Sequence, residues 1–584
     1  MAEHRPWFAS YPEGVPRTLE PYPEKSLFSL LEESAARFPD RPAVTWAVPG
    51  GRTLTYRQLL EETERFSAAL VKLGAGRGDR VGLLLPNCPQ YVIAYYATVR
   101  IGGVIVGNNP LYTRRELTHQ LADAGIEVLV ALDQLYPRVD PLREEVGIRE
   151  IVVTSVTDYM KFPVNLLAPL KLKREARHEG NPWPPVPADA RVQRWSQVMR
   201  SAGAPPPPVA DVNAKEDAAG FIYTGGTTGL SKGAMLSHFN LVSNAIQSAA
   251  WFQGLRDGRE AVMCVLPFFH SYGMTVCMNV GIYKAAKLVL VPRFELKGTL
   301  RAIQKERPTL FPGVPRLYIA LNEAEETKDF DLRSIRACLS GAAPLPLAVA
   351  KKFNSITGAS VVEGYGLTET SPVTHANPIE GKAKEGSIGL PIPDTDCKLV
   401  DIDDPAREVA PGEEGELAIA GPQVMLGYWN RKEETDEMIR TDEDGVRWLH
   451  SGDIAKVDEE GYFSIVDRKK DMIIVSGFNV YPTDVEQALY QHPAIEKVAV
   501  VGVPDAKTGE AVKAFVVLRK GANATPEEIV KWSREELTGY RAPKMVEIRE
   551  SLPETLVGKV LRRVLVDEDK KRAEDDHATT SERG

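Results

Sequence analysis

The sequence predicts an α/β protein, with a large N-terminal domain of layered, mostly parallel sheets flanked by helices and a small C-terminal α+β domain. Short continuous apolar runs alternate with helical patterns in the N-terminal half, as in parallel strands covered on both faces. Near Asp467 the pattern changes to strand, charged break, strand, loop and helix within about a hundred residues. A length of 584 residues indicates roughly two to four domains.

The elements of the large domain follow one another in a regular order. Residues 26–38 carry apolar side chains at helical spacing, and residues 79–87 form a short Val/Leu run that ends at Pro-Asn. A mostly apolar helix follows over residues 88–103 and ends at two glycines. The apolar runs at 127–133 and 149–155 are predicted to be two further buried strands of the same sheet.

Two segments interrupt this order. Pro205 to Pro208 predict an extended surface connector. Residues 158–178 are basic and apolar, a composition that favours contact with an anionic membrane surface, although a solvated insertion packed on its own domain is the alternative. Pro163 and Pro169 are expected to break any long helix there. The basic side chains are those of Lys161, Lys171, Lys173, Arg174 and Arg177.

Composition excludes several classes of protein. A formal charge of −9 argues against a general nucleic-acid binder. The five cysteines are far apart and odd in number, which disfavours a disulfide framework or a structural zinc site. The first residues lack the apolar region of a secretory signal, and no uninterrupted apolar stretch reaches the length of a membrane span. We therefore expect a cytoplasmic protein, at most peripheral on the inner face of the membrane.

Residues 223–234, YTGGTTGLSKGA, have the composition of a phosphate-binding loop. Glycines allow close approach of the backbone, hydroxyl and N–H groups hold phosphate oxygens, and Lys232 adds a positive charge. The loop matches neither the P-loop pattern, because Ser231 precedes the lysine, nor the dinucleotide fingerprint, because Gly225 and Gly226 are adjacent. It follows a predicted buried strand and precedes a helix that Ser237 can cap.

Four further segments follow in a fixed order: LSGAAPL at 339–345, VEGYGLTET at 362–370, a block at 448–482 containing HSGD and DRKKD, and LPETLVGKVLRR at 552–563. With the glycine-rich loop they resemble the motifs of the adenylate-forming enzymes, which include acyl-CoA synthetases, luciferases and peptide-synthetase adenylation domains. The resemblance extends from about residue 25 to 566. It implies binding of ATP and Mg²⁺, and for an acyl-CoA synthetase also of coenzyme A.

The resemblance implies a role for each motif. In the motif at 362–370, Tyr365 offers an aromatic face to adenine, and its glycine neighbours leave room for a flat ring. Thr368 would contact a phosphate oxygen and Glu369 would bind Mg²⁺. Asp453 and Arg468 would hold the ribose. The implied ATP- and AMP-binding residues are Thr224, Gly225, Gly226, Thr227, Thr228, Gly229, Lys232, Gly341, Ala342, Ala343, Glu363, Gly364, Tyr365, Gly366, Asp453 and Arg468.

The implied catalytic residues are Lys559, Thr368, Glu369 and His270. A cation such as Lys559 lowers the repulsion between an ionised carboxylate and ATP in a water-poor site. Val557 stands where the family pattern has serine, which loosens this match. His270 matches an aromatic motif near the acyl carboxylate, with a packed core histidine as the alternative. Ser476, Gly477 and Phe478 would form a loop for the coenzyme A step, and Lys470 would be the hinge of a mobile small domain.

The predicted division is 1–466 for AMP and acyl binding, 467–470 for the hinge, 471–566 for the lid with the catalytic lysine, and 567–584 for a disordered tail. The block from 467 onwards is most similar to bacterial long-chain fatty-acid–CoA ligases. We therefore expect a fatty acid, ATP and coenzyme A as substrates, with no nucleic-acid partner and with a homodimer left open. A medium-chain or coumarate-type acid–CoA ligase, or a fatty acyl-AMP former that loads an acyl carrier protein, is the alternative.

Overall fold

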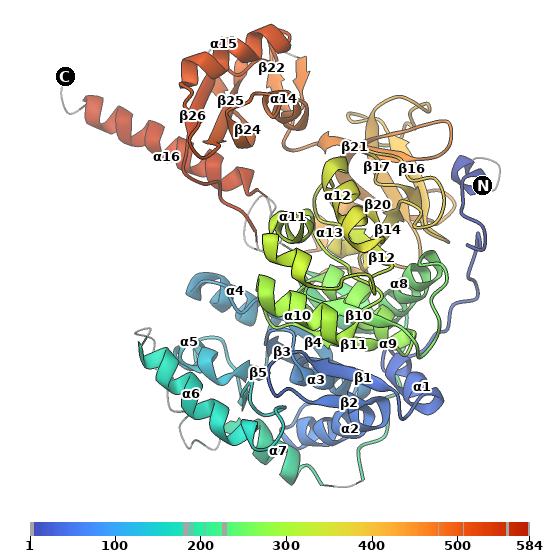
Figure 1. Ribbon diagram of the computed structural model, residues 1–584. Helices are drawn as coiled ribbons and strands as arrows, with labels where there is room; N and C mark the ends of the chain where they lie inside the picture. Colours follow the sequence, from blue (N-terminus) through green and yellow to red (C-terminus); the bar gives the residue numbers. More distant parts are fainter. Residues whose placement is uncertain are drawn as a thin grey trace. The chain divides into compact units, whose positions relative to one another are not determined.

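The computed structural model describes residues 5–178, 186, 189, 191–203, 205–224, 231–476, 478–505, 507–555 and 560–581. The chain divides into two compact units (Figure 1). The large unit comprises Trp7–Asp396 and Ile419–Leu449, and the small unit comprises Met1–Pro6, Cys397–Ala418 and His450–Gly584. Strands β17 and β20, given below, run from one unit into the other.

An eight-stranded sheet forms the centre of the large unit, in the order β18-β9-β8-β4-β3-β5-β6-β7. Its six strands from β8 to β7 are parallel, and the hairpin partner β9 and the short β18 are antiparallel. The predicted runs at 79–87, 127–133 and 149–155 form β3, β5 and β6, which confirms the expected parallel sheet. The strands are β3 Arg80–Leu84, β4 Val104–Gly107, β5 Val128–Leu132, β6 Glu150–Thr154, β7 Val192–Arg194, β8 Ala218–Thr224, β9 Lys232–Ser237 and β18 Gly427–Tyr428.

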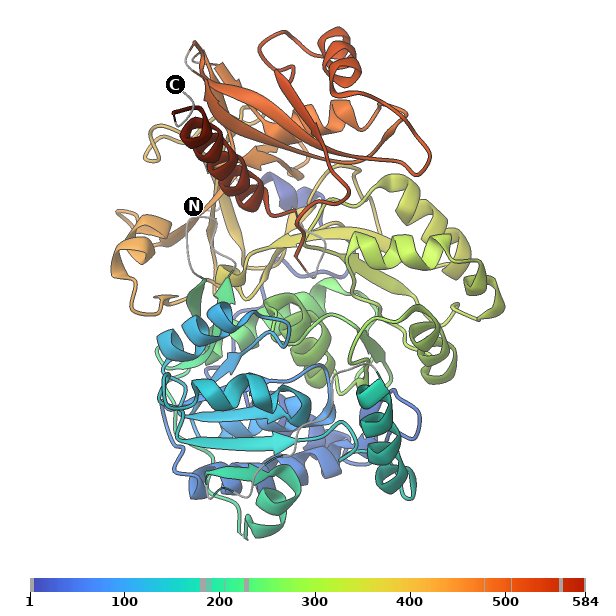
Figure 2. The same cartoon turned by 90° about the vertical axis from the view of Figure 1, so that its left-hand side faces the viewer.

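Helices cover both faces of this sheet (Figures 1 and 2). Every residue of α3 is buried, as expected for the apolar helix, and α4 contributes Leu117 and Leu121 to the core cluster on the opposite face. The helices of the first half of the unit are η1 Pro6–Ala9, α1 Ser29–Arg37, α2 Tyr56–Lys72, α3 Pro89–Arg100, α4 Arg114–Ala124, η2 Asp133–Leu135, α5 Tyr136–Val139, η3 Asp140–Leu142, α6 Val164–His178 and α7 Trp195–Ser201.

Two smaller sheets complete the large unit. One has the order β10-β11-β1-β2 with β10, β11 and β1 parallel, and the other has the order β12-β13-β14-β15 with β12 and β13 parallel. Their strands are β1 Pro42–Trp46, β2 Thr53–Thr55, β10 Ala261–Cys264, β11 Lys287–Leu290, β12 Ala337–Ser340, β13 Ser360–Gly366, β14 Val373–Ala376 and β15 Leu390–Pro391. Strand β19 Ile439–Thr441 belongs to a different sheet, in which it pairs with β20. The remaining helices are α8 His238–Trp251, the π-helical η4 Gly273–Asn279, α9 Val280–Tyr283, α10 Leu296–Glu306, α11 Pro315–Glu323, η5 Glu325–Asp329, α12 Leu347–Thr357, η6 Thr368–Thr370 and α13 Lys432–Met438.

In the part of the small unit that the structure describes, two sheets are accompanied by three helices. The order β16-β17-β20-β19 describes the first sheet, with β21 paired to β20, and β23-β22-β25-β24 describes the second, with β26 paired to β25. The elements are β16 Asp396–Val400, β17 Gly415–Ala420, β20 Arg447–Val457, β21 Phe463–Arg468, β22 Ile473–Val475, β23 Phe478–Val480, α14 Pro482–Leu489, β24 Ile495–Asp505, β25 Gly509–Leu518, α15 Pro526–Glu536, β26 Met545–Ile548 and α16 Arg562–Ser581.

Two features of the small unit differ from the sequence prediction. It begins well before residue 467, because β20 pairs with β21 over Asp453–Val457 and Glu416 forms an ion pair with Lys469 at 3.1 Å. The predicted disordered tail is helical as far as Ser581. Its first turns are attached because Leu565 is fully buried and Asp569 pairs with Lys513. Both differences come from contacts between distant residues, which composition does not reveal.

The basic apolar segment also differs from expectation, because α6 continues through Pro169. The missing proline N–H leaves the helix one hydrogen bond short but does not end it. Its apolar residues lie outward, with Phe162 79% exposed and Leu166, Leu167 and Leu170 each more than 60% exposed. Within the described residues, no helix combines the length and apolar character needed to cross a membrane.

All five cysteines are buried, and none of them forms a disulfide. Cys264 and Cys277 interact with each other, and burial raises the pKa of Cys264 well above its usual value. The Cys88 thiol lies at the start of α3, where burial raises its pKa to about 12. Each of these thiols is therefore part of the packed interior.

Candidate active site

The glycine-rich loop connects the two strands of the β8–β9 hairpin. Thr224 is the last residue of β8 and lies opposite Lys232, the first residue of β9. Ser237 caps α8, since its hydroxyl accepts the Asn240 N–H at 3.1 Å, which confirms the predicted cap. Strand β9 between loop and helix was not predicted. Gly225, Gly226, Thr227, Thr228 and Gly229 lie outside the described residues.

A chain of contacts links Lys232 to Glu369. The Lys232 ammonium lies 5.3 Å from the centre of the Tyr428 ring and 3.7 Å from a carboxylate oxygen of Glu434. The Tyr428 hydroxyl donates to Glu369 Oε1 at 2.6 Å. Burial, together with the Glu369 charge, raises the pKa of Tyr428 far above its usual value. The phenol therefore stays protonated and acts as the hydrogen-bond donor to Glu369. A lysine and a carboxylate from two predicted motifs are thus held on either side of one tyrosine.

The turn that carries Glu369 is held by several hydrogen bonds. The Thr370 hydroxyl donates to the Pro372 carbonyl at 2.7 Å, and the Ser371 hydroxyl donates to the Gln423 carbonyl at 2.9 Å. The hydroxyl of Thr368 lies 3.3 Å from that of Ser271. Because the backbone of the turn is fixed, Thr368 and Glu369 are preorganised for a ligand.

The residues around Glu369 fit a magnesium ion. Oε1 accepts the Tyr428 hydroxyl, and Oε2 has no hydrogen-bond partner among the described residues. Mg²⁺ in nucleotide sites binds one or two carboxylates together with substrate phosphates. Within the described ranges no group of three or more His, Cys, Asp and Glu side chains gathers into a metal site. A single carboxylate near the glycine-rich hairpin agrees with that mode of binding.

The motif predicted to bind adenine lies on β13. Tyr365 pairs with His375 of β14 across the sheet, and the two rings meet edge to face with centroids 5.8 Å apart. A Cβ atom at Gly366 would lie 1.9 Å from the Pro372 carbonyl oxygen, and one at Gly364 would lie 2.7 Å from Leu339 Cδ1. The sequence assigned these glycines to a flat ligand ring, whereas the structure gives them a reason within the protein, the close packing of β13.

Glu363 connects this motif to the turn after β12. It lies opposite Ser340 in the β12–β13 pairing, and its carboxylate accepts the Leu345 N–H at 3.1 Å. Burial raises the pKa of Glu363 to about 7, since one N–H does not replace the lost water. In the same turn Ala342 has a positive φ of 67°, which is strained for a residue with a Cβ. Gly341, Ala342 and Ala343 therefore form a sharp turn beside Glu363.

His270 lies on a loop attached to the same turn. Its Nδ1 accepts the Tyr272 N–H at 3.3 Å, so a neutral ring carries its proton on Nε2. The Tyr272 hydroxyl donates to the Leu339 carbonyl at 2.5 Å, next to Gly341. His270 is only half-buried. The histidine is thus brought to the β12 turn, as a site residue would be.

In the small unit, Asp453 and Arg468 are adjacent. They are directly opposite on β20 and β21, with Arg468 Nε 3.1 Å from Asp453 Oδ1. Asp453 is 2% exposed, and its backbone N–H donates to Ser451 Oγ at 3.1 Å. Fourteen positions separate these two residues in the sequence, and the antiparallel pairing brings them together.

The remaining predicted residues belong to the same unit. Lys470 is exposed two residues after the end of β21, and Ser476 has a positive φ of 52°. Phe478 is 57% exposed and stacks on Tyr540 with ring centroids 4.9 Å apart. Gly477 and Lys559 lie outside the described residues. Arg562, three positions after that lysine, pairs with Asp471 and Glu486 at 3.1 and 2.8 Å, which anchors the start of α16.

Several site residues were not predicted from the sequence. They are Ser271, Tyr428, Glu434, Tyr540 and Arg562. Tyr428 lies in a run, Gly-Tyr-Trp, in which aromatic residues usually indicate core. Ser271 directly follows the predicted residue His270, and this neighbouring position is the one feature of the sequence that could have indicated it.

The chain matches the family model described as AMP-binding enzyme over residues 31–429 and that of the AMP-binding enzyme C-terminal domain over 484–559. A long-chain-fatty-acid–CoA ligase of Bacillus subtilis strain 168 is 45% identical over 569 residues, covering 97% of this chain and 99% of the relative. A feruloyl-CoA synthase of Amycolatopsis sp is 36% identical over 523 residues, covering 89% and 95%.

A solved structure shares the fold over nearly the whole chain. ATP-bound MatB from Rhodopseudomonas palustris aligns with a TM-score of 0.78 at 28% identity, covering 93% of this chain and 98% of that one. The two family models together cover most of both units, and they match in the order in which the sequence motifs occur. The chain belongs to the AMP-binding enzyme family.

Proposed function

We propose that this chain is a long-chain fatty-acid–CoA ligase that converts a fatty acid, ATP and coenzyme A into acyl-CoA, AMP and pyrophosphate. The observation that carries the proposal is the contact from Lys232 through Tyr428 to Glu369, which holds a cation and a carboxylate at a glycine-rich hairpin. The relative that is 45% identical over almost the full length supports the long-chain assignment.

In the first half-reaction a carboxylate oxygen of the fatty acid attacks the α-phosphorus of ATP. A P–O bond forms to the acyl group, and the bond to pyrophosphate breaks with its electron pair. No general base is needed because the nucleophile is already ionised. Catalysis is therefore positioning and charge stabilisation. We assign Thr224, Lys232 and the loop between them to the leaving phosphates, and Lys559 to the reacting centre.

Other assignments concern the rest of the nucleotide. Tyr365 with the β12 turn is proposed to hold adenine, and Asp453 with Arg468 the ribose. Glu369 is proposed to bind Mg²⁺, whose chemistry is to neutralise developing charge on the phosphate oxygens. Thr368 would donate its hydroxyl to a phosphate oxygen. In each case the residue type fits the group, and the family motif supplies the role.

In the second half-reaction the coenzyme A thiol attacks the acyl carbonyl of the adenylate, a thioester forms and AMP leaves. His270 is proposed to lie near the acyl carboxylate, and Ser476, Gly477 and Phe478 to form the loop used in this step. Lys470 is proposed as the hinge. Lys470→Pro fixes the backbone φ angle at this position and so restricts rotation about it.

Measurement of each step separately tests the hinge. Lys470→Pro should slow acyl-CoA formation at least about tenfold while pyrophosphate release in the absence of coenzyme A stays near wild type. Lys470→Ala is the matched control, because it removes the side chain and keeps the backbone free. Equal loss of both steps in Lys470→Pro would exclude a hinge role.

Release of AMP with palmitate, octanoate and coumarate, each with and without coenzyme A, tests the proposed activity. We expect the fastest coenzyme-dependent turnover with palmitate. The feruloyl-CoA synthase relative favours an aryl acid as the second candidate, and faster turnover with coumarate would support it. Release of AMP that does not depend on coenzyme A would instead support an acyl-AMP former that loads a carrier protein.

We further propose that residues 158–178 bind an anionic membrane surface. Phe162, Leu166 and Leu170 follow one another at intervals of four and are exposed, and Lys161, Lys173 and Arg174 are exposed beside them. Leu166→Glu with Leu170→Glu should reduce co-sedimentation with phosphatidylglycerol vesicles about tenfold or more. Leu111→Glu, at an equally exposed leucine elsewhere, is the control, and an equal reduction in that variant would contradict the proposal. Sedimentation of the free protein also decides between monomer and homodimer.

A further inference from the structure

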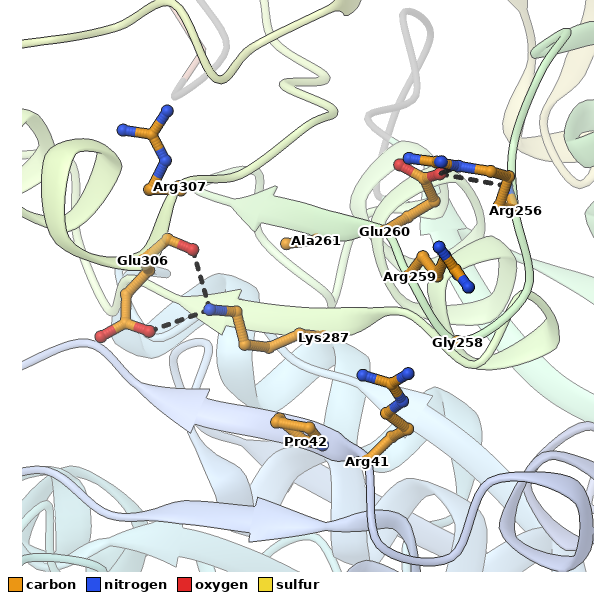
Figure 3. Close-up of a pocket in the computed structure, with 10 residues that line it drawn as sticks. All are labelled: Arg41, Pro42, Arg256, Gly258, Arg259, Glu260, Ala261, Lys287, Glu306 and Arg307. Carbon is orange, nitrogen blue, oxygen red and sulfur yellow. Dashed lines mark hydrogen bonds and ion pairs between the residues drawn. The ribbon is translucent and has the colours of Figure 1, made fainter.

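A charged cavity lies in the large unit, away from the motifs. It has a volume of about 530 Å³ and is lined by Arg41, Pro42, Arg256, Gly258, Arg259, Glu260, Ala261, Lys287, Glu306 and Arg307 (Figure 3). The lining carries five cationic side chains and two carboxylates. The chain as a whole has a net charge of −9, so this cavity opposes the average charge of the protein.

The cavity lies at the opposite end of the strands from the candidate active site. Pro42, Ala261 and Lys287 are the first residues of the parallel strands β1, β10 and β11. His270 and Gly341 follow the last residues of β10 and β12 instead. A four-residue strand spans about 13 Å, which separates the two ends. The cavity is therefore a different site from the one that the nucleotide motifs form.

Most of its charges are already paired within the protein. Glu260 is nearly fully buried and lies 2.5 Å from Arg336 and 3.8 Å from Arg256. Lys287 pairs with Glu306 at 3.1 Å. These pairs satisfy both carboxylates of the lining, so neither carboxylate is available to neutralise the other arginines.

Two arginines remain without a counter-charge. Among the described residues, the guanidinium groups of Arg41 and Arg259 form no ion pair or hydrogen bond. Figure 3 shows both side chains on the lining of the one cavity, while Lys287 turns toward Glu306. Their backbones are fixed, because Arg41 accepts the Tyr56 N–H and Arg259 donates to the Arg256 carbonyl. Two like charges without a counter-charge on the lining of one cavity favour binding of an anion there.

We propose that this cavity binds a soluble phosphate-bearing anion through Arg41 and Arg259. The planar guanidinium matches phosphate oxygens with two parallel N–H bonds, so two arginines suit a ligand with at least two charged oxygens. No lining residue is aromatic, which favours a compact anion such as pyrophosphate over recognition of a base. No lining residue is a large exposed hydrophobic side chain, so a lipid tail finds no support there.

Calorimetric titration with pyrophosphate in the absence of divalent cations tests the proposal, which does not depend on the proposed function. Lys232→Ala is the background, since it weakens the phosphate site of the hairpin. We expect the Lys232→Ala variant to bind pyrophosphate. Introducing Arg41→Ala and Arg259→Ala into that variant should weaken binding about tenfold or more. Arg65→Ala with Arg200→Ala removes the same charge from exposed positions on α2 and α7 and should leave binding unchanged.

Further arms distinguish the sources of phosphate. Binding of pyrophosphate or ADP that depends on Arg41 and Arg259 supports the proposal, with the tighter ligand naming the source. Binding to phosphatidylglycerol vesicles that depends on these arginines, without binding of either soluble anion, overturns it. An unchanged dissociation constant in the double variant, or complete loss of binding through Lys232→Ala alone, also overturns it. If the variant with both alanine substitutions has a lowered melting temperature, the titration is done with Arg41→Gln and Arg259→Gln in their place.

Discussion

Two buried carboxylates, one in each unit, are restrained in opposite ways. Asp453 is paired with a cation, since Arg468 lies 3.1 Å away, whereas Glu369 is held by the neutral hydroxyl of Tyr428 at 2.6 Å. The first pair carries no net charge, and the second keeps the full negative charge of the carboxylate. A neutral pair suits hydrogen bonds to an uncharged sugar, and a charged group suits a metal ion. The partner of a carboxylate thus indicates its ligand better than the carboxylate itself.

Glu369→Gln removes the charge but keeps the shape, and it should have the largest effect. The amide can still accept the Tyr428 hydroxyl, but it cannot neutralise a divalent cation. We expect the rate of pyrophosphate release to fall about 10³-fold, in the range found when one stabilising group is removed from an active site. ATP–pyrophosphate exchange at several Mg²⁺ concentrations measures it. A rate within threefold of wild type would separate Glu369 from the metal.

Asp453→Asn should have the next largest effect, since it removes the negative charge that faces Arg468. Loss of a charge-assisted hydrogen bond costs about 1.5–3 kcal/mol, which corresponds to a rise of about 10- to 100-fold in KM for ATP. The maximal rate should change less, because the ribose is not the reacting group. Wild-type kinetics with 2′-deoxy-ATP provide the matched comparison. If Asp453→Asn changed the rate and not KM, the ribose assignment would be wrong.

Tyr428→Phe sharpens the comparison, because it removes the neutral partner and keeps both charges. A single hydrogen bond contributes about 0.5–1.5 kcal/mol, so pyrophosphate release should slow about tenfold or less. The ring that lies against Lys232 stays in place. An effect as large as that of Glu369→Gln would mean that the phenol, and not the carboxylate, contacts the ligand.

Glu363 is a third carboxylate, for which the described residues supply neither a cation nor a phenol, and burial raises its pKa to about 7. A raised pKa stabilises the folded protein below the unfolded value near 4.5, and this stabilisation is lost as the pH rises through 7. Glu363→Gln does not titrate, so its stability relative to wild type should improve from pH 5 to 8, by about 1 kcal/mol after allowance for partial exposure. Urea denaturation at four pH values measures this, and a constant difference would contradict the assignment.

Much of the fold follows from local sequence. The apolar runs of the large unit predicted strands β3, β5 and β6, and Ser237 predicted the start of α8, because burial on both faces and helix capping depend on nearby residues. The extent of the small unit and the helical tail were missed. Both depend on partners far along the chain, such as Glu416 for Lys469 and Lys513 for Asp569. Local patterns carry no information on those pairs.

The same division holds for the site. Motif order identified Lys232, Glu369, Asp453 and Arg468, and the structure brings these residues together within their own units. Tyr428 could not be predicted, because it reaches Glu369 only through the pairing of β18 with β9. The glycines beside Tyr365 were recognised, but their steric reason required the position of Pro372. Sequence thus supplied the chemical groups, and the structure supplied the contacts that hold them.

The burial of all five cysteines has a consequence for an enzyme that makes acyl-adenylates. Such mixed anhydrides acylate accessible thiolates, and a surface cysteine near the product would compete with coenzyme A and inactivate the protein. Burial keeps these thiols out of reach, and it also raises the pKa of Cys88 to about 12, so that this thiol stays protonated and poorly nucleophilic. The protein is thereby protected from self-acylation by its own intermediate.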